Sequence, residues 1–246
     1  MKEFFIEHPN LPKGRVSLAM CGEYPLILSA LHNIGIRTVS FRSDLLADEV
    51  ARHQDMLMCH TGNDIIFSDR SQNISLLEKE GFTVFRESGL SAEYPGDVKL
   101  NVAIGSEFCI FNPNTISPSL KDFLIEKKLQ ITHTRQGYTK CSLCFVSENA
   151  VITEDTSIKK ALENTGTDVL LISKGDIYLS EKHYGFFGGS TGKISEDTLA
   201  VTGELKYHRD ADAITEFCNN HHVKIHELNK GRITDIGGIL PLKEMR

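Results

Sequence analysis

The chain of 246 residues has no excess of basic side chains, no long apolar run and no leader-like start. It carries 27 Lys and Arg against 33 Asp and Glu, with a net charge of −6, and they are scattered without a basic stripe. Nucleic acid is therefore not an expected partner. No apolar run approaches membrane-spanning length, which excludes a transmembrane protein. The first nine residues are too polar and acidic for a signal peptide. We expect a cytoplasmic protein.

The six cysteines lie mostly within apolar stretches, where a free thiol behaves as a small hydrophobe. Cys141 and Cys144 have CxxC spacing, but an alternating strand would direct their sulfurs to opposite faces. No second CxxC and no nearby His pair completes a zinc site. We expect neither a metal nor another cofactor, with metal or disulfide chemistry at this pair as the less favoured alternative.

A short amphipathic helix, a tight link and a strand of β-branched and aromatic residues recur five times along the chain. The helices and the strands that follow them are residues 26–33 with 34–41, 76–80 with 81–85, 119–127 with 129–132, 157–164 with 166–172, and 212–220 with 223–228. A Ser-x-x-Asp capping box at Ser119 and Asp122 is expected to open the third helix. The links fall at positions 35, 81, 129, 166 and 222. This spacing suits one supersecondary unit repeated with loop insertions.

A hairpin with a polar turn follows each of the first three links. The hairpins are residues 56–60 with 65–67, 98–104 with 108–111, and 141–146 with 150–153. The last unit is short, and a strand at residues 16–20 is placed to complete it. The pattern predicts one α/β domain over residues 1–246, a five-bladed pseudo-symmetric α/β propeller of β-β-α-β units. The alternative is an open α/β sandwich that alternates helix and strand without closing.

In such a ring, equivalent positions of the units converge near the axis. With the hairpins in register, the positions that open strands are Asp55, Asp97, Cys141 and Asp235. Residues two apart share a strand face, so we expect His53 beside Asp55, and Asn101 beside Asp97. Carboxylates would hold a guanidinium bidentately, a thiolate could attack its carbon, and an imidazole could move the proton. In the alternative interpretation, each aspartate is a turn residue that bonds its own backbone.

Two further features lie close to these positions. Lys140 precedes Cys141, and an adjacent ammonium would favour the thiolate, although strand neighbours point to opposite faces. The glycine-rich segment 185–194 departs from the phosphate-loop pattern at two positions. We expect Gly188 and Gly189 instead to permit a backbone bend or a close approach to a ligand at the axis.

Several strings of the sequence resemble those of an uncharacterised bacterial family with the guanidino-group-modifying-enzyme (pentein) fold. They are NLPKG (10–14), YPGD (94–97) leading to NVA (101–103), QGYTKCS (136–142), GFFGGSTG (185–192) and DIGGILPL (235–242). The resemblance covers nearly the whole chain and implies the five-unit ring. Characterised proteins of this fold include arginine deiminases, amidinotransferases and dimethylarginine hydrolases, and also a ribosome anti-association factor without catalysis.

For those enzymes the resemblance implies a cysteine nucleophile near the C-terminus and a base from a His-x-Asp strand. His53-Gln54-Asp55 is similar to that strand, although it lies in a different unit. Gly237 and Gly238 are similar to the glycines before the nucleophile, but no cysteine follows Cys218. The enzymatic mechanism then requires Cys141 to act from another unit.

Two functions remain open. The first is an enzyme that acts on a small guanidino, amidino or related amide compound in an axial pocket. In it Cys141 is the nucleophile and His53 the base, and the substrate is bound by Asp55, Asp97, Asn101, Lys140, Gly188, Gly189 and Asp235. The second is a catalytically silent protein that binds a small metabolite, or a protein or RNA partner. A lowered thiol pKa at Cys141 would favour the first. Free helix surface leaves room for a homodimer.

Overall fold

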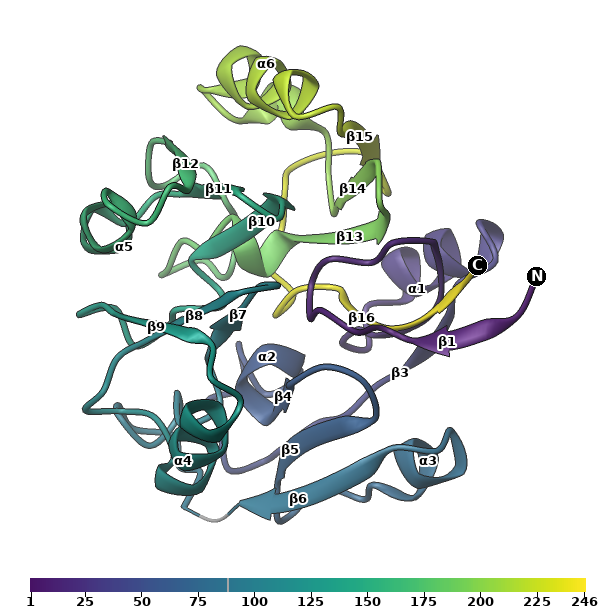
Figure 1. Ribbon diagram of the computed structural model, residues 1–246. Helices are drawn as coiled ribbons and strands as arrows, with labels where there is room; N and C mark the ends of the chain where they lie inside the picture. The colour runs from purple at the N-terminus through teal and green to yellow at the C-terminus, as the bar shows by residue number, and fades with distance from the viewer. Residues whose placement is uncertain (88) are drawn as a thin grey trace.

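Five small sheets are arranged around a central axis, with helices α3 to α6 on the periphery (Figure 1). The computed structural model describes residues 1–87 and 89–246. In each sheet an antiparallel pair is followed by a helical crossover to a third strand, which runs parallel to the second. The five-unit α/β propeller predicted from the sequence is therefore confirmed.

Four of the units are continuous in sequence. The first comprises β4 (Met58–His60), β5 (Ile65–Asp69), α3 (Ser75–Lys79) and β6 (Thr83–Glu87). The second comprises β7 (Ala103–Ile104), β8 (Phe108–Phe111), α4 (Pro118–Glu126) and β9 (Gln130–His133). The third comprises β10 (Leu143–Ser147), β11 (Ala150–Thr153), α5 (Thr156–Leu162) and β12 (Asp168–Leu171). The fourth comprises β13 (Thr191–Ser195), β14 (Thr198–Val201), α6 (Ala211–Asn220) and β15 (Lys224–Glu227), with short 3-10 turns at Gly188–Ser190 and Leu205–Tyr207.

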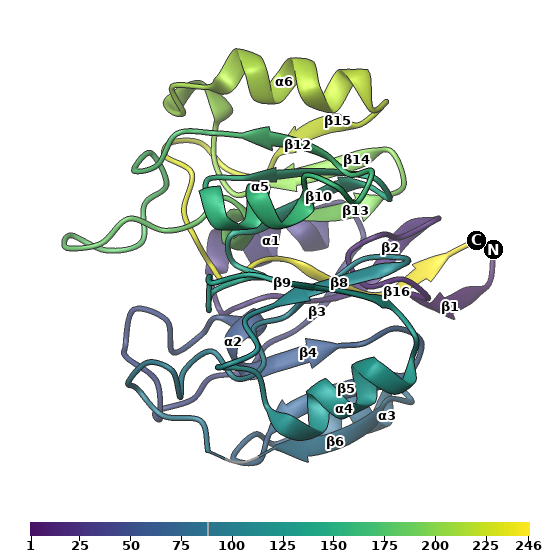
Figure 2. The same ribbon diagram turned by 60° about the vertical axis from the view of Figure 1, so that its left-hand side comes forward.

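The fifth unit joins the two ends of the chain. It comprises β16 (Leu240–Met245), β2 (Arg15–Met20), α1 (Pro25–Asn33) and β3 (Arg37–Val39), with β1 (Glu3–Phe5) added at its edge. β16 pairs antiparallel with β2, so the predicted completion of the last unit by the N-terminal strand is confirmed. The alternative prediction of an open α/β sandwich is therefore wrong. Both termini lie side by side in Figures 1 and 2, and the long connecting loops extend from the opposite side of the ring in Figure 2.

Each of the five crossover helices, α1 and α3 to α6, passes to its strand through one residue with a positive φ angle. These residues are Gly35, Gly81, Lys128, Gly166 and His222, all at or next to the predicted links. A left-handed residue ends a helix by satisfying its last carbonyl groups, and glycine adopts that conformation most readily. The repeat read from the sequence therefore corresponds to one recurring helix ending.

The capping box predicted at Ser119 is wrong. α4 begins one residue earlier, at Pro118, and the hydroxyl of Ser119 bonds to Glu87 instead. A side-chain cap is found on α5, where Asp155 accepts hydrogen bonds from the backbone N–H groups of Ser157 and Ile158.

In the three units for which a hairpin was predicted, the first strand begins later than predicted. Asp55 lies in the one-turn helix α2 (Gln54–Leu57), and residues 97–102 and Cys141 lie before β7 and β10. The expected strand faces, with His53 beside Asp55 and Asn101 beside Asp97, are therefore wrong. The physical reason is that these segments bond across the axis to the neighbouring units and not along a ladder.

These cross-axis bonds form a closed circuit through all five units. Asp55 N–H donates to Gly237 O at 3.3 Å, Asn101 Nδ2 donates to Asp55 O at 3.1 Å, and Lys140 N–H donates to Asn101 Oδ1 at 2.7 Å. Gly189 N–H donates to Cys141 O at 2.8 Å, and Ile236 N–H donates to Gly189 O at 2.9 Å. The residues predicted to meet at the axis are thus held together there.

All six cysteines are free and buried. Cys141 packs in one apolar cluster, with Leu18 and Met58, whereas Cys144 packs in another, with Phe187 and Ile214. The two cysteines of the CxxC string therefore lie in different apolar clusters of the interior. Over the residues that the structure describes, no helix combines the length and apolar character needed to cross a bilayer.

Candidate active site

A cavity of about 290 Å³ lies beside the axial circuit. Its floor contains four of the predicted residues, His53, Asp97, Cys141 and Asp235, all buried. The rest of its lining is Ala47, Glu49, Val50, Met56, Ala92, Tyr138, Leu179, His183 and Phe186. Four residues predicted to lie close together, which carry a thiol, an imidazole and two carboxylates, therefore line one cavity.

The thiol of Cys141 is held against a carboxylate. Its Sγ lies 3.0 Å from Oδ2 of Asp55, to which it donates, and it accepts a hydrogen bond from Asn101 Nδ2, also at 3.0 Å. Burial, followed by the negative charges of Asp55 and Asp235, raises the pKa of Cys141 well above that of a free thiol. The sulfur is therefore a protonated thiol, and the lowered pKa that would mark an already activated cysteine is not found.

Asn101 fixes the two partners relative to each other. Its amide nitrogen bonds to Cys141 Sγ and to Asp55 O, and its amide oxygen accepts from the backbone N–H groups of Lys140 and Cys141. All four contacts are internal. Asn101 therefore positions the thiol of Cys141, and substrate contact by its side chain stays a prediction.

A second contact with a carboxylate lies on the same floor. His53 Nδ1 is 3.6 Å from Asp235 Oδ1, and the Asp235 carboxylate accepts the backbone N–H groups of Phe186 and Gly237. Burial raises the pKa of Asp235. A Cβ atom added at Gly189 would stand only 2.1 Å from Asp235 Oδ1, so this glycine makes room for the carboxylate.

Gly188 is also closely packed, on the other side of the floor. A Cβ atom there would lie 2.6 Å from the carbonyl oxygen of Cys141. The close approach expected of Gly188 and Gly189 is therefore observed toward the protein itself. Their approach to a ligand stays a prediction.

Asp97 is paired with an aromatic wall. Tyr138 Oη donates to Asp97 Oδ2 at 2.5 Å, and the Tyr138 ring stacks on Phe186 with centroids 5.8 Å apart. Burial raises the pKa of Asp97, against the opposing effect of this hydrogen bond. The wall gives the cavity an apolar side next to its acidic floor.

Two polar atoms of the cavity lining, His53 Nε2 and Asp97 Oδ1, have no hydrogen-bond partner within the described chain, and the same holds for Asp55 Oδ1 on the neighbouring small cavity. A buried polar atom without a partner costs about 1–3 kcal/mol. None of the described residues that line the cavity is Lys or Arg. The site therefore offers acceptors and negative charge, which suits a cationic ligand that carries several N–H groups.

Lys140 lies on a different cavity. Together with Asp55 and His60 it lines a space of about 20 Å³, which is large enough for one water molecule. His60 is buried and its Nδ1 is without a partner in the described chain, and burial lowers its pKa to about 4. Contact between Lys140 and a substrate stays a prediction.

The mouth of the cavity is formed by residues that the sequence analysis did not single out. Glu49 and His183 come from two long loops, and Glu49 Oε1 lies 2.9 Å from His183 Nδ1. Their side chains are 32% and 60% exposed, respectively. Strand and helix periodicity carries no information on such loops, so no signal pointed to these two residues.

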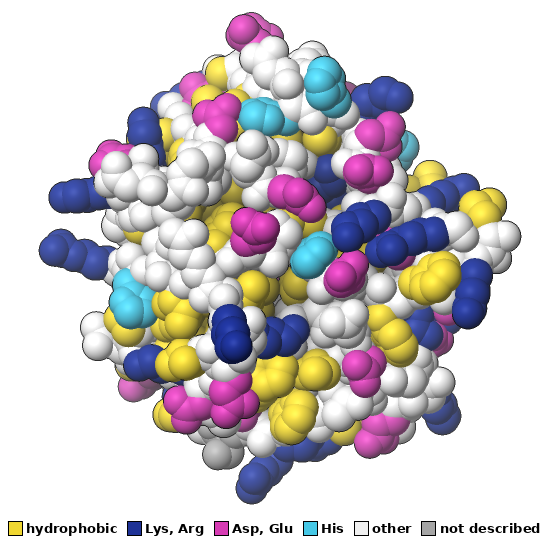
Figure 3. Space-filling model, viewed as in Figure 1, with side chains coloured by type: hydrophobic (Ala, Val, Ile, Leu, Met, Phe, Trp, Pro, Cys, Tyr) yellow, Lys and Arg dark blue, Asp and Glu magenta, His cyan; other side chains and the backbone are white. Residues whose placement is uncertain are grey.

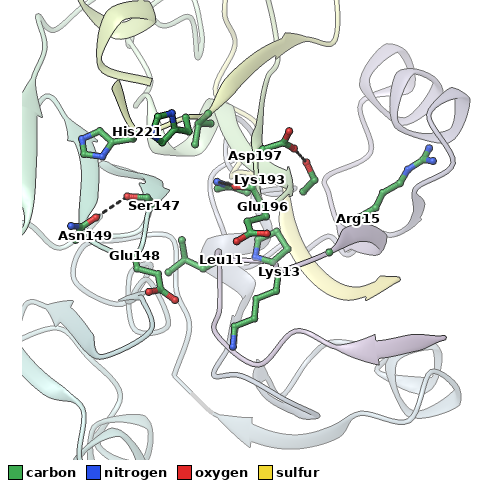
Figure 4. Close-up of a pocket in the computed structure, with 15 residues that line it drawn as sticks. Leu11, Lys13, Arg15, Ser147, Glu148, Asn149, Lys193, Glu196, Asp197 and His221 are labelled. Atoms are coloured by element: carbon green, nitrogen blue, oxygen red, sulfur yellow. Dashed lines mark hydrogen bonds between the residues drawn. The ribbon is translucent and has the colours of Figure 1, made fainter. Parts of the chain in front are cut away.

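A larger hollow of about 760 Å³ lies at the opposite ends of β10 and β13 from Cys141 and Gly189. Figure 4 shows its lining from the hairpin turns, residues 11–15 and the link before β15. The buried amine of Lys193 bonds there to the carbonyl oxygens of Val146 and Glu196, which ties two hairpins together. Basic and acidic side chains are interspersed over the face seen in Figure 3. In residues 1–87 and 89–246, no group of three or more His, Cys, Asp or Glu is arranged to hold a metal.

Comparison with known proteins relates the chain to one family and to several solved structures. The profile of a family of unknown function (DUF6873) matches residues 22–240. No curated protein matches the sequence. Each similar structure below has 9–11% sequence identity.

The inosamine-phosphate amidinotransferase of Streptomyces griseus gives a TM-score of 0.56 at 10% identity, over 100% of this chain and 98% of that one. The agmatine deiminase of C. jejuni gives 0.55 at 11% identity, over 93% and 91%. DDAH from Pseudomonas aeruginosa, in complex with citrulline, gives 0.55 at 9% identity, over 92% and 96%. These likenesses establish the pentein fold.

Proposed function

The chain belongs to the DUF6873 family of unknown function, and we propose that it is a hydrolase of small guanidino or amidino compounds. The observation that carries the proposal is the placement of Cys141. Its sulfur lies on a cavity floor that also holds His53, Asp97 and Asp235. The sulfur is hydrogen-bonded to Asp55.

The floor suits a guanidinium group because its unused bonding capacity consists of acceptors. A guanidinium carries only N–H donors in a planar fork and pairs bidentately with carboxylates. Asp97 Oδ1, on the lining of the cavity, lacks a partner in the described chain. A bound guanidinium would satisfy this atom and offset the charge of the buried acids.

The same cation would activate the thiol. Burial, followed by the negative charges of Asp55 and Asp235, raises the pKa of Cys141. A positive charge bound among these groups acts in the opposite direction, since an opposite charge within about 4–6 Å favours the ionised form. The thiol proton then passes along the existing hydrogen bond to Asp55 as the sulfur attacks.

In the first step the Cys141 thiol gives its proton to Asp55, and a sulfur lone pair forms a bond to the guanidinium carbon. The C–N bond to the leaving nitrogen breaks with its electron pair, and protonated His53 supplies the proton that makes this nitrogen a neutral amine or ammonia. A cationic thiouronium remains on the enzyme.

In the second step water attacks the thiouronium carbon. One proton of the water goes to His53 and the other to the released amine or ammonia, which departs as a cation. The S–C bond breaks with its electron pair on sulfur, and sulfur recovers the proton from Asp55. The products are a urea and an ammonium compound, and no oxidant or reductant is needed.

The similar structures support this proposal by their named activities, since they include an amidinotransferase and an agmatine deiminase. They share the fold at low identity, so the proposal depends on the site itself. The alternative is a catalytically silent protein that binds a cationic metabolite in the same cavity. The raised pKa of Cys141 and its exposure of only 2% favour that alternative.

The test is to incubate the protein with a panel of alkylguanidines and amidines and to measure ammonia or amine release together with the intact mass. We expect turnover by the parent protein and none by Cys141→Ser or His53→Gln, because His53 protonates the leaving nitrogen in the first step; a thiouronium adduct is expected only in the parent protein. Cys144→Ser is the matched control, because Cys144 packs in a different cluster, and it should retain turnover. Binding without adduct or turnover would support the silent alternative. Absence of binding would overturn both.

A further inference from the structure

The small cavity of about 20 Å³ brings together three polar side chains that the proposed chemistry does not explain as a group. Asp55, His60 and Lys140 line it, whereas Cys141 lies on the larger cavity. All three side chains are buried, at 1%, 6% and 7% exposure, respectively. The rest of the lining is largely apolar and includes Met58, Leu100 and Leu240. The polar groups therefore face a space that holds one water molecule.

Two of these side chains present acceptor atoms that the described chain leaves unpaired. Oδ2 of Asp55 accepts from the Cys141 thiol at 3.0 Å, whereas its Oδ1 has no partner. His60 Nε2 lies 2.9 Å from the carbonyl oxygen of Asn63, and its Nδ1 has no partner. Burial lowers the pKa of His60 to about 4, so the ring is neutral at pH ~7. A carbonyl only accepts, so Nε2 carries the proton and Nδ1 is an acceptor.

Lys140 adds donors to the same space. An ammonium carries three N–H donors and no acceptor. A water molecule can accept from this ammonium and donate one O–H to each of the two unpaired acceptors. Three hydrogen bonds is the usual number for a buried water. A bound cation is disfavoured because it would face the charge of Lys140, and a bound anion because it would face Asp55.

We propose that one water molecule, bonded to Asp55 Oδ1, His60 Nδ1 and Lys140 Nζ, is a fixed component of the ring axis, and that His60 is a positioning residue for Asp55. The inference rests on the proposed function, because it takes Asp55 as the acceptor of the Cys141 proton. A carboxylate bonded through both oxygens keeps Oδ2 directed at the sulfur. His60 does not line the larger cavity, so it acts through the water.

The position of Asp55 has a measurable consequence at the sulfur. Burial, followed by the charges of Asp55 and Asp235, raises the pKa of Cys141. A carboxylate that is free to turn away from the thiol raises this pKa less. Loss of the acceptor at His60 Nδ1 should therefore increase the thiolate fraction of Cys141 and the rate at which it is alkylated. Asp235 is unchanged by a substitution at His60.

Two variants separate the roles of the two ring nitrogens of His60. The amide of asparagine reaches the position of Nδ1, and the amide of glutamine, which is longer by one methylene group, reaches that of Nε2. His60→Asn therefore keeps an acceptor for the water and loses the donor to Asn63. His60→Gln keeps the donor to Asn63 and loses the acceptor for the water. A role that is structural only, through the bond to Asn63, predicts the opposite order of effects.

The first measurement is the rate of iodoacetamide labelling of Cys141 as a function of pH, in the absence of any substrate. We expect His60→Gln to be labelled at least about threefold faster than the parent at neutral pH, and His60→Asn to stay within about twofold of it. His133→Gln is the matched control, because His133 is an exposed histidine of β9, and it should not change the rate. Circular dichroism establishes that the variants are folded.

The second measurement is a crystal structure of the parent protein, which does not depend on the folding of any variant. We expect a water oxygen within about 3.2 Å of both Asp55 Oδ1 and His60 Nδ1. The inference is overturned if this water is absent, or if His60→Gln has no greater effect on labelling than His60→Asn. If both measurements agree with the inference but no guanidine is bound or turned over, only the proposed function fails.

Discussion

The sulfur of Cys141 lies 3.0 Å from Oδ2 of Asp55, although 86 residues separate the two in sequence. The contact joins the third unit of the ring to the first. Burial, and after it the charge of Asp55, opposes ionisation of the sulfur and raises the pKa of the thiol.

Replacing Asp55 by Asn should increase the reactivity of Cys141 toward small alkylating agents. Loss of the carboxylate removes one of the causes that raise the pKa of the thiol. A decrease of one pKa unit raises the thiolate fraction about tenfold at neutral pH. The measurement is the rate of iodoacetamide labelling of the Cys141 peptide as a function of pH.

The matched control for this labelling is Asp122→Asn, which removes an exposed aspartate from α4 and should leave the rate unchanged. Turnover of a guanidine should fall in Asp55→Asn, because the thiol loses its proton acceptor. An unchanged labelling rate would show that Asp55 does not control the ionisation of the sulfur.

Gly189→Ala should impair ligand binding more than its effect on stability explains. The added Cβ atom would stand 2.1 Å from Asp235 Oδ1, so the carboxylate must move away from His53 and the floor. We expect guanidinium affinity to fall at least about tenfold and the free energy of unfolding to fall by about 1–3 kcal/mol. Calorimetric titration and chemical denaturation measure the two quantities.

Gly166→Ala provides the comparison for this variant. Gly166 has φ +79° and no atom within 4 Å of an added Cβ, so alanine introduces backbone strain far from the cavity. We expect a similar loss of stability with an unchanged affinity. Equal affinities in the two variants would contradict the role assigned to Gly189.

Glu154→Gln should stabilise the protein in alkaline solution. Burial raises the pKa of Glu154 to about 8, from a reference value of 4.5. Between these two pH values the folded state binds more protons than the unfolded state, so the parent protein loses stability as pH rises through this window. Glutamine does not ionise, and it can still accept the backbone N–H of Phe187 as Oε1 does at 3.1 Å.

The expected gain over the parent is about 2–4 kcal/mol at pH ~9 and close to zero at pH ~4. It is measured by urea denaturation at both pH values. Glu148→Gln, at an exposed hairpin turn, is the control and should show no such dependence. A gain that is equal at both pH values would refute the assigned titration.

Asn101→Ala should destabilise the fold strongly because it opens the axial circuit. The variant loses four hydrogen bonds and leaves the N–H groups of Lys140 and Cys141 without their acceptor. We expect a loss of about 2–4 kcal/mol in the free energy of unfolding. The exposed Asn114, changed in the same way, should alter stability by less than about 0.5 kcal/mol. A loss no greater than that of Asn114→Ala would mean that the circuit does not stabilise the ring.

The ring could be predicted from the sequence because its repeat depends on local features, namely helix endings and turns. Each unit ends its helix at a residue with positive φ, and three of the five are glycines, Gly35, Gly81 and Gly166. The hairpin β13–β14 was missed because the preceding glycine-rich segment, residues 185–192, carries no alternating pattern. Fold prediction succeeded where helix endings and turns decide the structure.

The candidate site could be predicted only in part. Alignment of the units brought Cys141, Asp55, Asp97 and Asp235 together, but it paired Cys141 with His53 as nucleophile and base. The structure places Asp55 against the thiol and Asp235 against His53. Those pairings depend on how turn segments from different units approach each other, which no local pattern encodes.

Closure of the ring has a consequence for the order in which the protein can fold during synthesis. β16 is the strand of the fifth unit that bonds directly to β2 and to β1, and residues 235–238 carry the last contacts of the axial circuit. While the ribosome is still adding these residues, β2 has no antiparallel partner and Asp55 has no Gly237 to bond. The nascent chain can therefore assemble four blades in sequence, but the floor of the cavity forms only once residues 235–238 have been added.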